Sequence, residues 1–185
     1  SAFDSTVACT TDTVQILDET SLESIATYQL NNATTSIPSN TYPGTASNIT
    51  YAAGKFGQAA VFNGSSSHID LGTTDFVQSN NSFTISAWCY FDTLASPNAI
   101  VTKWNNTGVN ESWGFWHYNG GATTLHFAHR QANNTVTTAY SNSGALTANQ
   151  WQHCVLVWNG DTVSFYVNGA NVGTTVNSGF NNPTK

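Results

Sequence analysis

The segment 151–169, WQHCVLVWNGDTVSFYVNG, restricts the fold more than any other part of the chain. Apolar side chains alternate along two runs of this segment, which predicts strands whose successive side chains point to opposite faces. Asn159-Gly160 separates the runs, and Asn168-Gly169 closes the second run. Asn-Gly pairs supply the positive φ angles that tight hairpin turns require. The segment therefore predicts an antiparallel hairpin in an all-β protein.

Similar short runs recur along the chain. Asn63-Gly64 and Asn119-Gly120 repeat the turn signal. Many short strands with turns between them favour a sandwich or jelly roll over a helical or α/β fold. Upstream of the hairpin, we expect strands at 25–30, 48–52, 59–63, 68–71, 83–91, 99–104, 113–118, 125–130 and 135–140.

Composition excludes two classes of partner. Only 8% of the 185 residues are charged, the net charge is −6, and four side chains are basic. A phosphate-binding surface needs several clustered Lys or Arg, so we expect no nucleic-acid partner. No apolar run approaches the roughly 18–20 residues of a membrane span, so we expect no membrane insertion. The polar, weakly charged composition is common in secreted and viral-fibre β domains.

Three segments together resemble the laminin G-like domains of the concanavalin A-like superfamily. They are GKFGQAAVFNGSSSHIDLG (54–72), SFTISAWCYF (82–91) and LTANQWQHCVLVWNGDTVSFYVNG (146–169). The match covers about residues 25–175, with Tyr28 in the opening strand. The resemblance implies a two-sheet antiparallel jelly roll over residues 25–185, preceded by an extended lead-in segment at 1–24. Members of the family are mostly non-catalytic glycan-binding or adhesion modules, some with calcium at the rim.

The variant that this chain resembles is common in tail-fibre and other structural proteins of phages. The family's closing strand has no counterpart before Lys185, and the chain begins at Ser1 rather than Met. We therefore expect part of a larger assembly, with an open sheet edge covered by neighbouring chains. The expected role is carbohydrate binding on a tail-fibre or capsid decoration protein, at the virion surface, for host attachment to a cell-surface glycan. One alternative is an extracellular adhesion domain, either secreted or at the cell surface. The other is a purely structural virion protein without glycan binding.

Catalysis is not expected, although some glucanases share this fold. Glycosidases need two carboxyl groups flanking the scissile bond. The carboxylates after residue 25 show no i, i+2 pairing; they are Asp70, Asp75, Asp92, Glu111 and Asp161. No Gly-x-Ser-x-Gly nucleophile elbow is present, and His126 and His129 fall on opposite faces of one strand. The sequence therefore predicts a protein that is not an enzyme.

Aromatic residues between 104 and 130 are the candidate ligand-binding set, because sugar rings stack on flat apolar faces. The candidates are Trp104, Trp113, Trp116, Tyr118 and Arg130. Within the run 113–118, Trp113 shares one face with Phe115 and His117, whereas Trp116 shares the other with Tyr118. One of these two sets must belong to the core, and the sequence leaves open which one.

A calcium site and a disulfide are two further hypotheses. Calcium binds six to eight oxygens, and the side chains of Asn63, Asp70 and Asp75 could supply some of them where the rim loops converge. Cys89 and Cys154 lie in strand-like runs, so they are either a cross-strand disulfide or two buried thiols.

Overall fold

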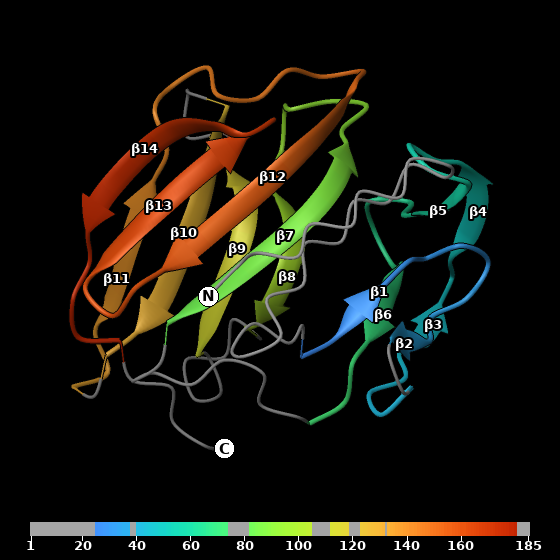
Figure 1. The fold of residues 1–185 in the computed structure, drawn as a ribbon, viewed down its shortest axis with the longest axis horizontal. Coiled ribbons are helices and arrows are strands. Elements are labelled where there is room, and N and C mark those ends of the chain that lie inside the picture. Colours follow the sequence, from blue (N-terminus) through green and yellow to red (C-terminus); the bar gives the residue numbers. More distant parts are fainter. Residues whose placement is uncertain are drawn as a thin grey trace, which may run out of the picture. The chain divides into compact units, whose positions relative to one another are not determined.

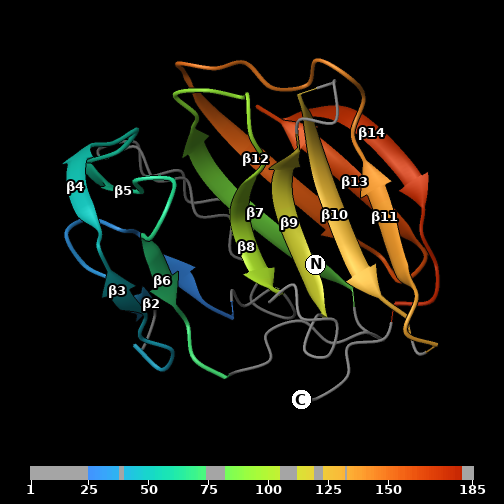
Figure 2. The same cartoon turned by 180° about the vertical axis from the view of Figure 1, so that it is seen from behind.

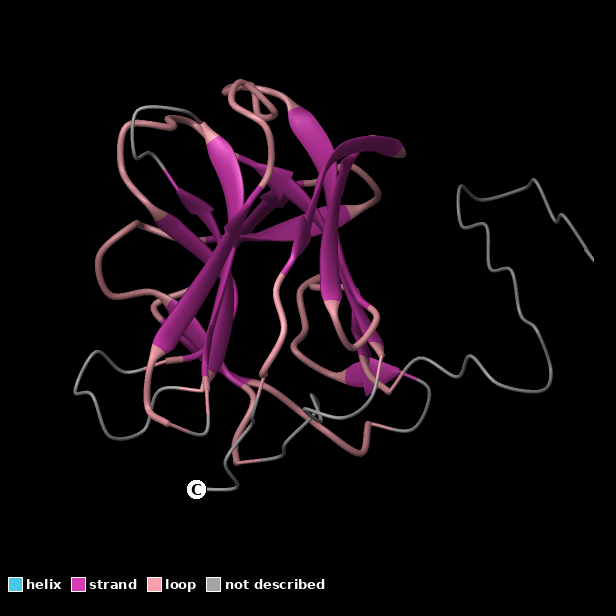
Figure 3. Ribbon diagram, turned by 90° about the vertical axis from the view of Figure 1, so that its left-hand side faces the viewer, coloured by secondary structure: helices cyan, strands magenta, loops and turns pink. Residues whose placement is uncertain are grey.

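The computed structural model describes residues 25–37, 40–73, 82–104, 112–118, 123–131 and 133–180. These residues form strands and loops and no helix (Figure 3). None of them forms a helix long and apolar enough to cross a membrane. The prediction of an all-β protein is therefore confirmed. The strands fall into two compact units, one before and one after the boundary between Phe76 and Val77.

The C-terminal unit is a sandwich of two four-stranded antiparallel sheets (Figures 1 and 2). The first, called here the β12 sheet, has the strand order β14-β13-β12-β7. Its strands are β7 (Phe83–Tyr90), β12 (Trp151–Trp158), β13 (Thr162–Val167) and β14 (Ala170–Val176). The second, the β10 sheet, has the order β11-β10-β9-β8. Its strands are β8 (Asn98–Lys103), β9 (Trp113–Tyr118), β10 (Thr124–Arg130) and β11 (Val136–Tyr140).

The β12–β13 hairpin forms as the sequence predicts. Trp158 lies opposite Val163, and Leu156 lies opposite Phe165. Gly160 has a φ of 103°, a conformation that residues with a Cβ rarely adopt. The Asn159 side-chain oxygen accepts hydrogen bonds from the backbone N–H groups of Asp161 (3.2 Å) and Thr162 (2.9 Å). The turn residues therefore fix the register of this hairpin.

Large side chains from both sheets fill the interior of the sandwich. The ring centroids of Phe115 and Phe165, from opposite sheets, are 6.5 Å apart, and those of Phe127 and Trp158 are 6.2 Å apart. All four side chains are fully buried. Burying an apolar side chain of this size stabilises a fold by about 1.5–3 kcal/mol relative to exposing it. These contacts therefore hold the two sheets together.

The N-terminal unit consists of three two-stranded antiparallel pairs. Their strands are shorter than those of the sandwich, and among its apolar side chains Phe56 and Phe62 are about half exposed. The pairs are β1 (Thr27–Tyr28) with β2 (Ser36–Ile37), β3 (Thr45–Ser47) with β6 (His68–Asp70), and β4 (Thr50–Ala53) with β5 (Gln58–Val61).

The lead-in segment, the last strand of the sandwich and the two cysteines can now be compared with the sequence analysis. The lead-in at 1–24 lies outside the described residues. Strand β14 was not predicted, because Gly173 and Asn171 interrupt the alternation of apolar residues. Cys89 and Cys154 are both free thiols on neighbouring strands, and Cys154 is fully buried. A hydrogen bond to Cys154, with burial, raises the pKa of the Cys89 thiol well above its ordinary value.

Candidate functional site

Strand β9 separates the aromatic residues of the candidate site into two sets. Trp113, Phe115 and His117 are buried, whereas Trp116 and Tyr118 on the other face are half-buried. The second set lies on the outer face of the β10 sheet, away from the β12 sheet. The structure thus resolves which set belongs to the core.

The pairing register of the β10 sheet brings three rings together on this outer face. His126 lies directly opposite Trp116 on one neighbouring strand and Tyr140 on the other. The His126 and Tyr140 rings are nearly parallel, at 5°, with centroids 4.4 Å apart. The Trp116 and His126 centroids are 5.3 Å apart. Tyr118 adds a fourth ring, whose centroid lies 5.2 Å from that of His126. The four rings, from three strands, form a continuous cluster.

Gly114 makes room for the indole of Trp116. The two residues share the outer face of β9, two positions apart. A Cβ on Gly114 would lie 2.0 Å from Cη2 of Trp116, so the indole lies where a side chain of residue 114 would project. The Trp116 ring therefore lies along the strand, over the backbone of Gly114.

Trp104 adds a ring at nearly a right angle to that of Trp116. Their centroids are 5.6 Å apart and their planes meet at 84°. The guanidinium carbon of Arg130 lies 5.9 Å from the centroid of the Trp104 ring, a cation–π distance. Nη1 of Arg130 also donates a hydrogen bond of 2.6 Å to the backbone oxygen of Asn134. Arg130 is only 9% exposed, so its guanidinium presents little charge at the surface and lies against the Trp104 ring.

We call this cluster the Trp116 face. It consists of Trp104, Trp116, Tyr118, His126, Arg130 and Tyr140. Burial lowers the pKa of His126 to about 4, so its imidazole is neutral near pH 7. Its Nε2 is buried and has no hydrogen-bond partner among the described residues. The cluster therefore presents a largely apolar surface of flat rings in which the one charged group is nearly buried.

Four of the five predicted ligand-binding residues lie on this face, and Trp113 does not. The Trp113 side chain is 4% exposed and belongs to the core of the sandwich. The reason is the alternation along β9, which directs Trp113 inward with Phe115. His126 and Tyr140 were not among the predicted residues, because only the pairing register of β9, β10 and β11 shows that they meet Trp116.

Two of the three residues proposed for calcium, Asn63 and Asp70, lie in the described part of the chain, and each accepts hydrogen bonds from residues close to it in sequence. The Asn63 side-chain oxygen accepts hydrogen bonds from the backbone N–H groups of Ser65, Ser66 and Ser67, so it closes its own loop. A carboxylate oxygen of Asp70 accepts a 2.8 Å hydrogen bond from the N–H of Gly72. Asp75 lies outside the described residues. The described residues contain no group of three or more His, Cys, Asp or Glu side chains that could hold a metal ion.

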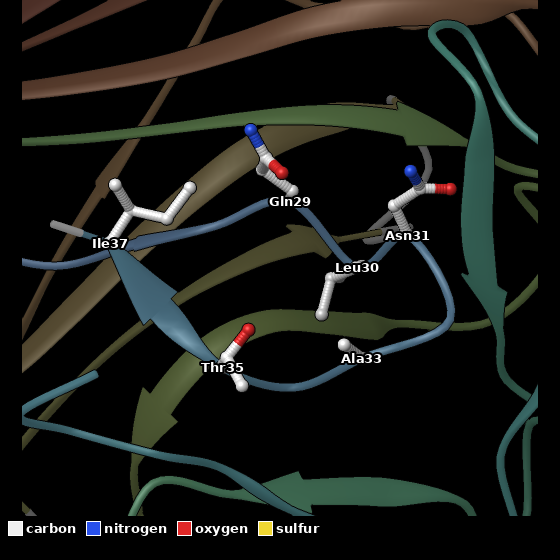
Figure 4. A pocket seen from close by; sticks show the side chains of 6 residues that line it. All are labelled: Gln29, Leu30, Asn31, Ala33, Thr35 and Ile37. Carbon is white, nitrogen blue, oxygen red and sulfur yellow. The ribbon is translucent and has the colours of Figure 1, made fainter. Parts of the chain in front are cut away.

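A small pocket in the N-terminal unit offers little chemistry. It is formed by the loop between β1 and β2 and the adjoining residues (Figure 4). Its lining contains no ionisable side chain and no aromatic ring; the residues are Gln29, Leu30, Asn31, Ala33, Thr35 and Ile37. The Trp116 face is the stronger candidate, since it combines flat rings with partial exposure.

The sequence of residues 63–185 matches a laminin G-type family model that describes the concanavalin A-like lectin/glucanases superfamily. The chain belongs to this superfamily. The match spans the whole sandwich unit, and it confirms the resemblance and the jelly-roll class inferred from the three segments above. No curated protein sequence matches the chain.

Solved structures at low identity share the fold of this member of the superfamily. The binding domain of Paraclostridial Mosquitocidal Protein 1 has a TM-score of 0.59 at 14% identity; the match covers 80% of this chain but only 39% of that domain. Domain 4 of the extracellular arabinanase AbnA from Geobacillus stearothermophilus, solved with arabinotriose, has a TM-score of 0.56 at 21% identity, covering 82% and 76%. An S-layer domain-containing protein from Clostridium thermocellum reaches 0.50 at 24% identity, covering 83% and 72%.

Proposed function

We propose that the sandwich unit is a non-catalytic carbohydrate-binding module and that the Trp116 face is its binding surface. The observation that carries this proposal is the perpendicular arrangement of Trp104 and Trp116 beside the His126 and Tyr140 rings. Sugar rings have apolar C–H faces that pack on flat aromatic rings, and the phenolic hydroxyl of a tyrosine can both donate and accept hydrogen bonds. Tyr140 is 41% exposed and can offer its hydroxyl in this way.

Membership of a lectin and glucanase superfamily supports a carbohydrate ligand. The arabinanase domain with the same fold was solved with arabinotriose, which makes a neutral oligosaccharide a reasonable first ligand to test. The described carboxylates, Asp70, Asp92 and Asp161, are all exposed and lie outside the Trp116 face. This arrangement favours binding without hydrolysis.

A glycan array with the complete 185-residue chain tests the proposal, run with added calcium and again with a chelator. We expect the wild type to bind one class of neutral glycan. We expect Trp116→Ala to lower the affinity for that glycan about tenfold, because buried aromatic anchors typically dominate binding energy. Phe62→Ala is a control, since Phe62 is an exposed aromatic residue of the N-terminal unit. Binding that Trp116→Ala leaves unchanged would contradict the proposed surface. We also propose that calcium binds near Asn63, Asp70 and Asp75, which a calorimetric titration of the chain with calcium alone would test.

We place this module on a tail-fibre or capsid decoration protein at the virion surface, where it attaches to host glycans. The support is the resemblance of the chain to the phage-type variant and its polar, weakly charged composition. Antibodies against the chain should label intact virus particles. Labelling of cell surfaces or culture medium instead would favour a secreted or cell-surface adhesion domain. Virion labelling with no glycan binding would favour a purely structural protein that packs on neighbouring chains.

A further inference from the structure

The outer face of the β12 sheet carries a second group of aromatic side chains. Strand β7 alternates strictly, so that Trp88 and Tyr90 point outward while Ala87 and Cys89 point toward the core. Trp88 is 40% exposed and Tyr90 is 44% exposed. Large aromatic residues exposed in a group mark interaction sites more often than single exposed ones.

Strand pairing arranges these rings as two neighbouring rungs. Trp88 lies directly opposite His153, and Tyr90 directly opposite Trp151. The Trp88 and His153 centroids are 5.1 Å apart, with the planes 26° from parallel. Tyr90 meets Trp151 edge-on, at 5.7 Å and 61°. Since alternate residues of a strand are about 7 Å apart, a chain of linked sugar rings can contact both rungs.

Polar groups beside the rings suit hydroxyl-bearing ligands. Oγ of Ser86 is 2.7 Å from Nε2 of His153, so one of these groups donates to the other. Burial lowers the pKa of His153, which keeps the imidazole neutral near pH 7. Strands β7, β12, β13 and β14 contain no Asp, Glu, Lys or Arg at all. A charged ligand would lose hydration here without gaining an opposite charge on these strands, so the sheet favours a neutral ligand.

We propose that these residues, Ser86, Trp88, Tyr90, Trp151 and His153, form a second carbohydrate-binding surface, the Trp88 face, which takes a neutral polysaccharide. The inference rests on the proposed carbohydrate-binding function, and it adds a separate site to it. The two sheets that carry these faces are the two layers of one sandwich (Figures 1 and 2), and each face is on the side of its sheet turned away from the other sheet. One sandwich can then hold two polysaccharide strands, and binding at both faces raises the apparent affinity for a polymer through effective concentration.

Binding of the full chain to immobilised arabinan and laminarin tests the Trp88 face. In a Trp116→Ala background, we expect residual binding that Trp88→Ala or Tyr90→Ser lowers about tenfold. Val176→Ala in the same background is the matched control. Val176 is exposed and apolar, and it lies on the same sheet, on the edge strand β14 farthest from β7. This control should bind as the background does.

A second measurement needs no variant that could misfold. Laminarin or arabinan oligosaccharides added to the wild-type chain should shift the NMR signal of the Trp88 indole N–H as well as that of Trp116. If Trp88→Ala binds like Val176→Ala and the Trp88 signal does not move, the Trp88 face is overturned while the Trp116 face stands. Absence of binding by the wild type would overturn both. If Trp88→Ala instead changes the oligomeric state seen by light scattering, without affecting polysaccharide binding, the face contacts a second copy and the carbohydrate proposal is wrong.

Discussion

Gly114 determines where the indole of Trp116 can lie. We expect Gly114→Ala to displace the ring, because the new Cβ would lie 2.0 Å from Cη2, closer than two non-bonded carbon atoms can approach. The β-strand conformation itself accepts alanine, so the sandwich should still fold. Glycan binding should fall about as far as in Trp116→Ala, roughly tenfold. Tryptophan fluorescence should change as well; unchanged fluorescence with full binding would contradict the assigned position of the ring.

His126 should make the sandwich sensitive to acid. Its pKa is lowered to about 4 by burial, whereas in the unfolded chain it returns to about 6.5. The neutral form is thus favoured by folding, and the stability it contributes is present above about pH 6.5 and is lost progressively as pH falls through 4. The pKa values of His117 and His129 are lowered by burial too, so they add to the effect with the same sign.

The variant His126→Phe isolates the contribution of this residue. Phenylalanine keeps a flat ring against Tyr140 and Trp116, and Nε2 of His126 has no described hydrogen-bond partner to lose. Urea unfolding of the wild type and the variant between pH 7.5 and pH 4 gives the comparison. We expect the stability of the variant to fall less steeply as the pH is lowered, and parallel pH profiles would show that His126 does not titrate differently on folding.

The β12–β13 turn depends on one amide side chain. Asn159→Ala removes the acceptor for the N–H groups of Asp161 and Thr162 and for the hydroxyl of Thr162. We expect it to lower the free energy of unfolding by about 1–2 kcal/mol. Asn159→Asp retains an acceptor oxygen and should cost less. Urea denaturation of both variants provides the measurement, and equal losses would mean that these hydrogen bonds do not stabilise the turn.

The strands of the sandwich and the β12–β13 pairing were largely predictable from the sequence, but the other strand pairings were not. The run 113–118 has the same bounds in the structure, since its alternation and flanking turns are local properties. Its two faces were both aromatic, so local pattern could not identify the core face. That choice depends on which side meets Phe165 of the other sheet. The contact of His126 with Tyr140 likewise depends on a pairing register between strands, which a single sequence does not specify.

Charged residues are scarce both in the whole chain and on the two sheets of the sandwich. The chain has only 14 Lys, Arg, Asp and Glu residues. Ten of these are acidic, and five of the ten acidic residues lie within residues 1–24. The β12 sheet has no charged residue, and the β10 sheet contributes the nearly buried Arg130 to its aromatic cluster. A ligand at these faces would therefore gain its affinity from ring contacts and neutral hydrogen bonds, which suits neutral sugars better than phosphate-bearing ligands.

This distribution of charge also bears on catalysis. A glycosidase places two carboxyl groups about 5–9.5 Å apart across the scissile bond. Of the described carboxylates, Asp92 follows β7 and Asp161 lies in the β12–β13 turn, and neither belongs to an aromatic face. We therefore expect no release of reducing ends when the complete chain is incubated with laminarin or arabinan under conditions in which it binds them. Release that Asp92→Asn or Glu111→Gln abolishes, while binding persists, would make the protein a hydrolase; release unaffected by both variants would point to a contaminating enzyme.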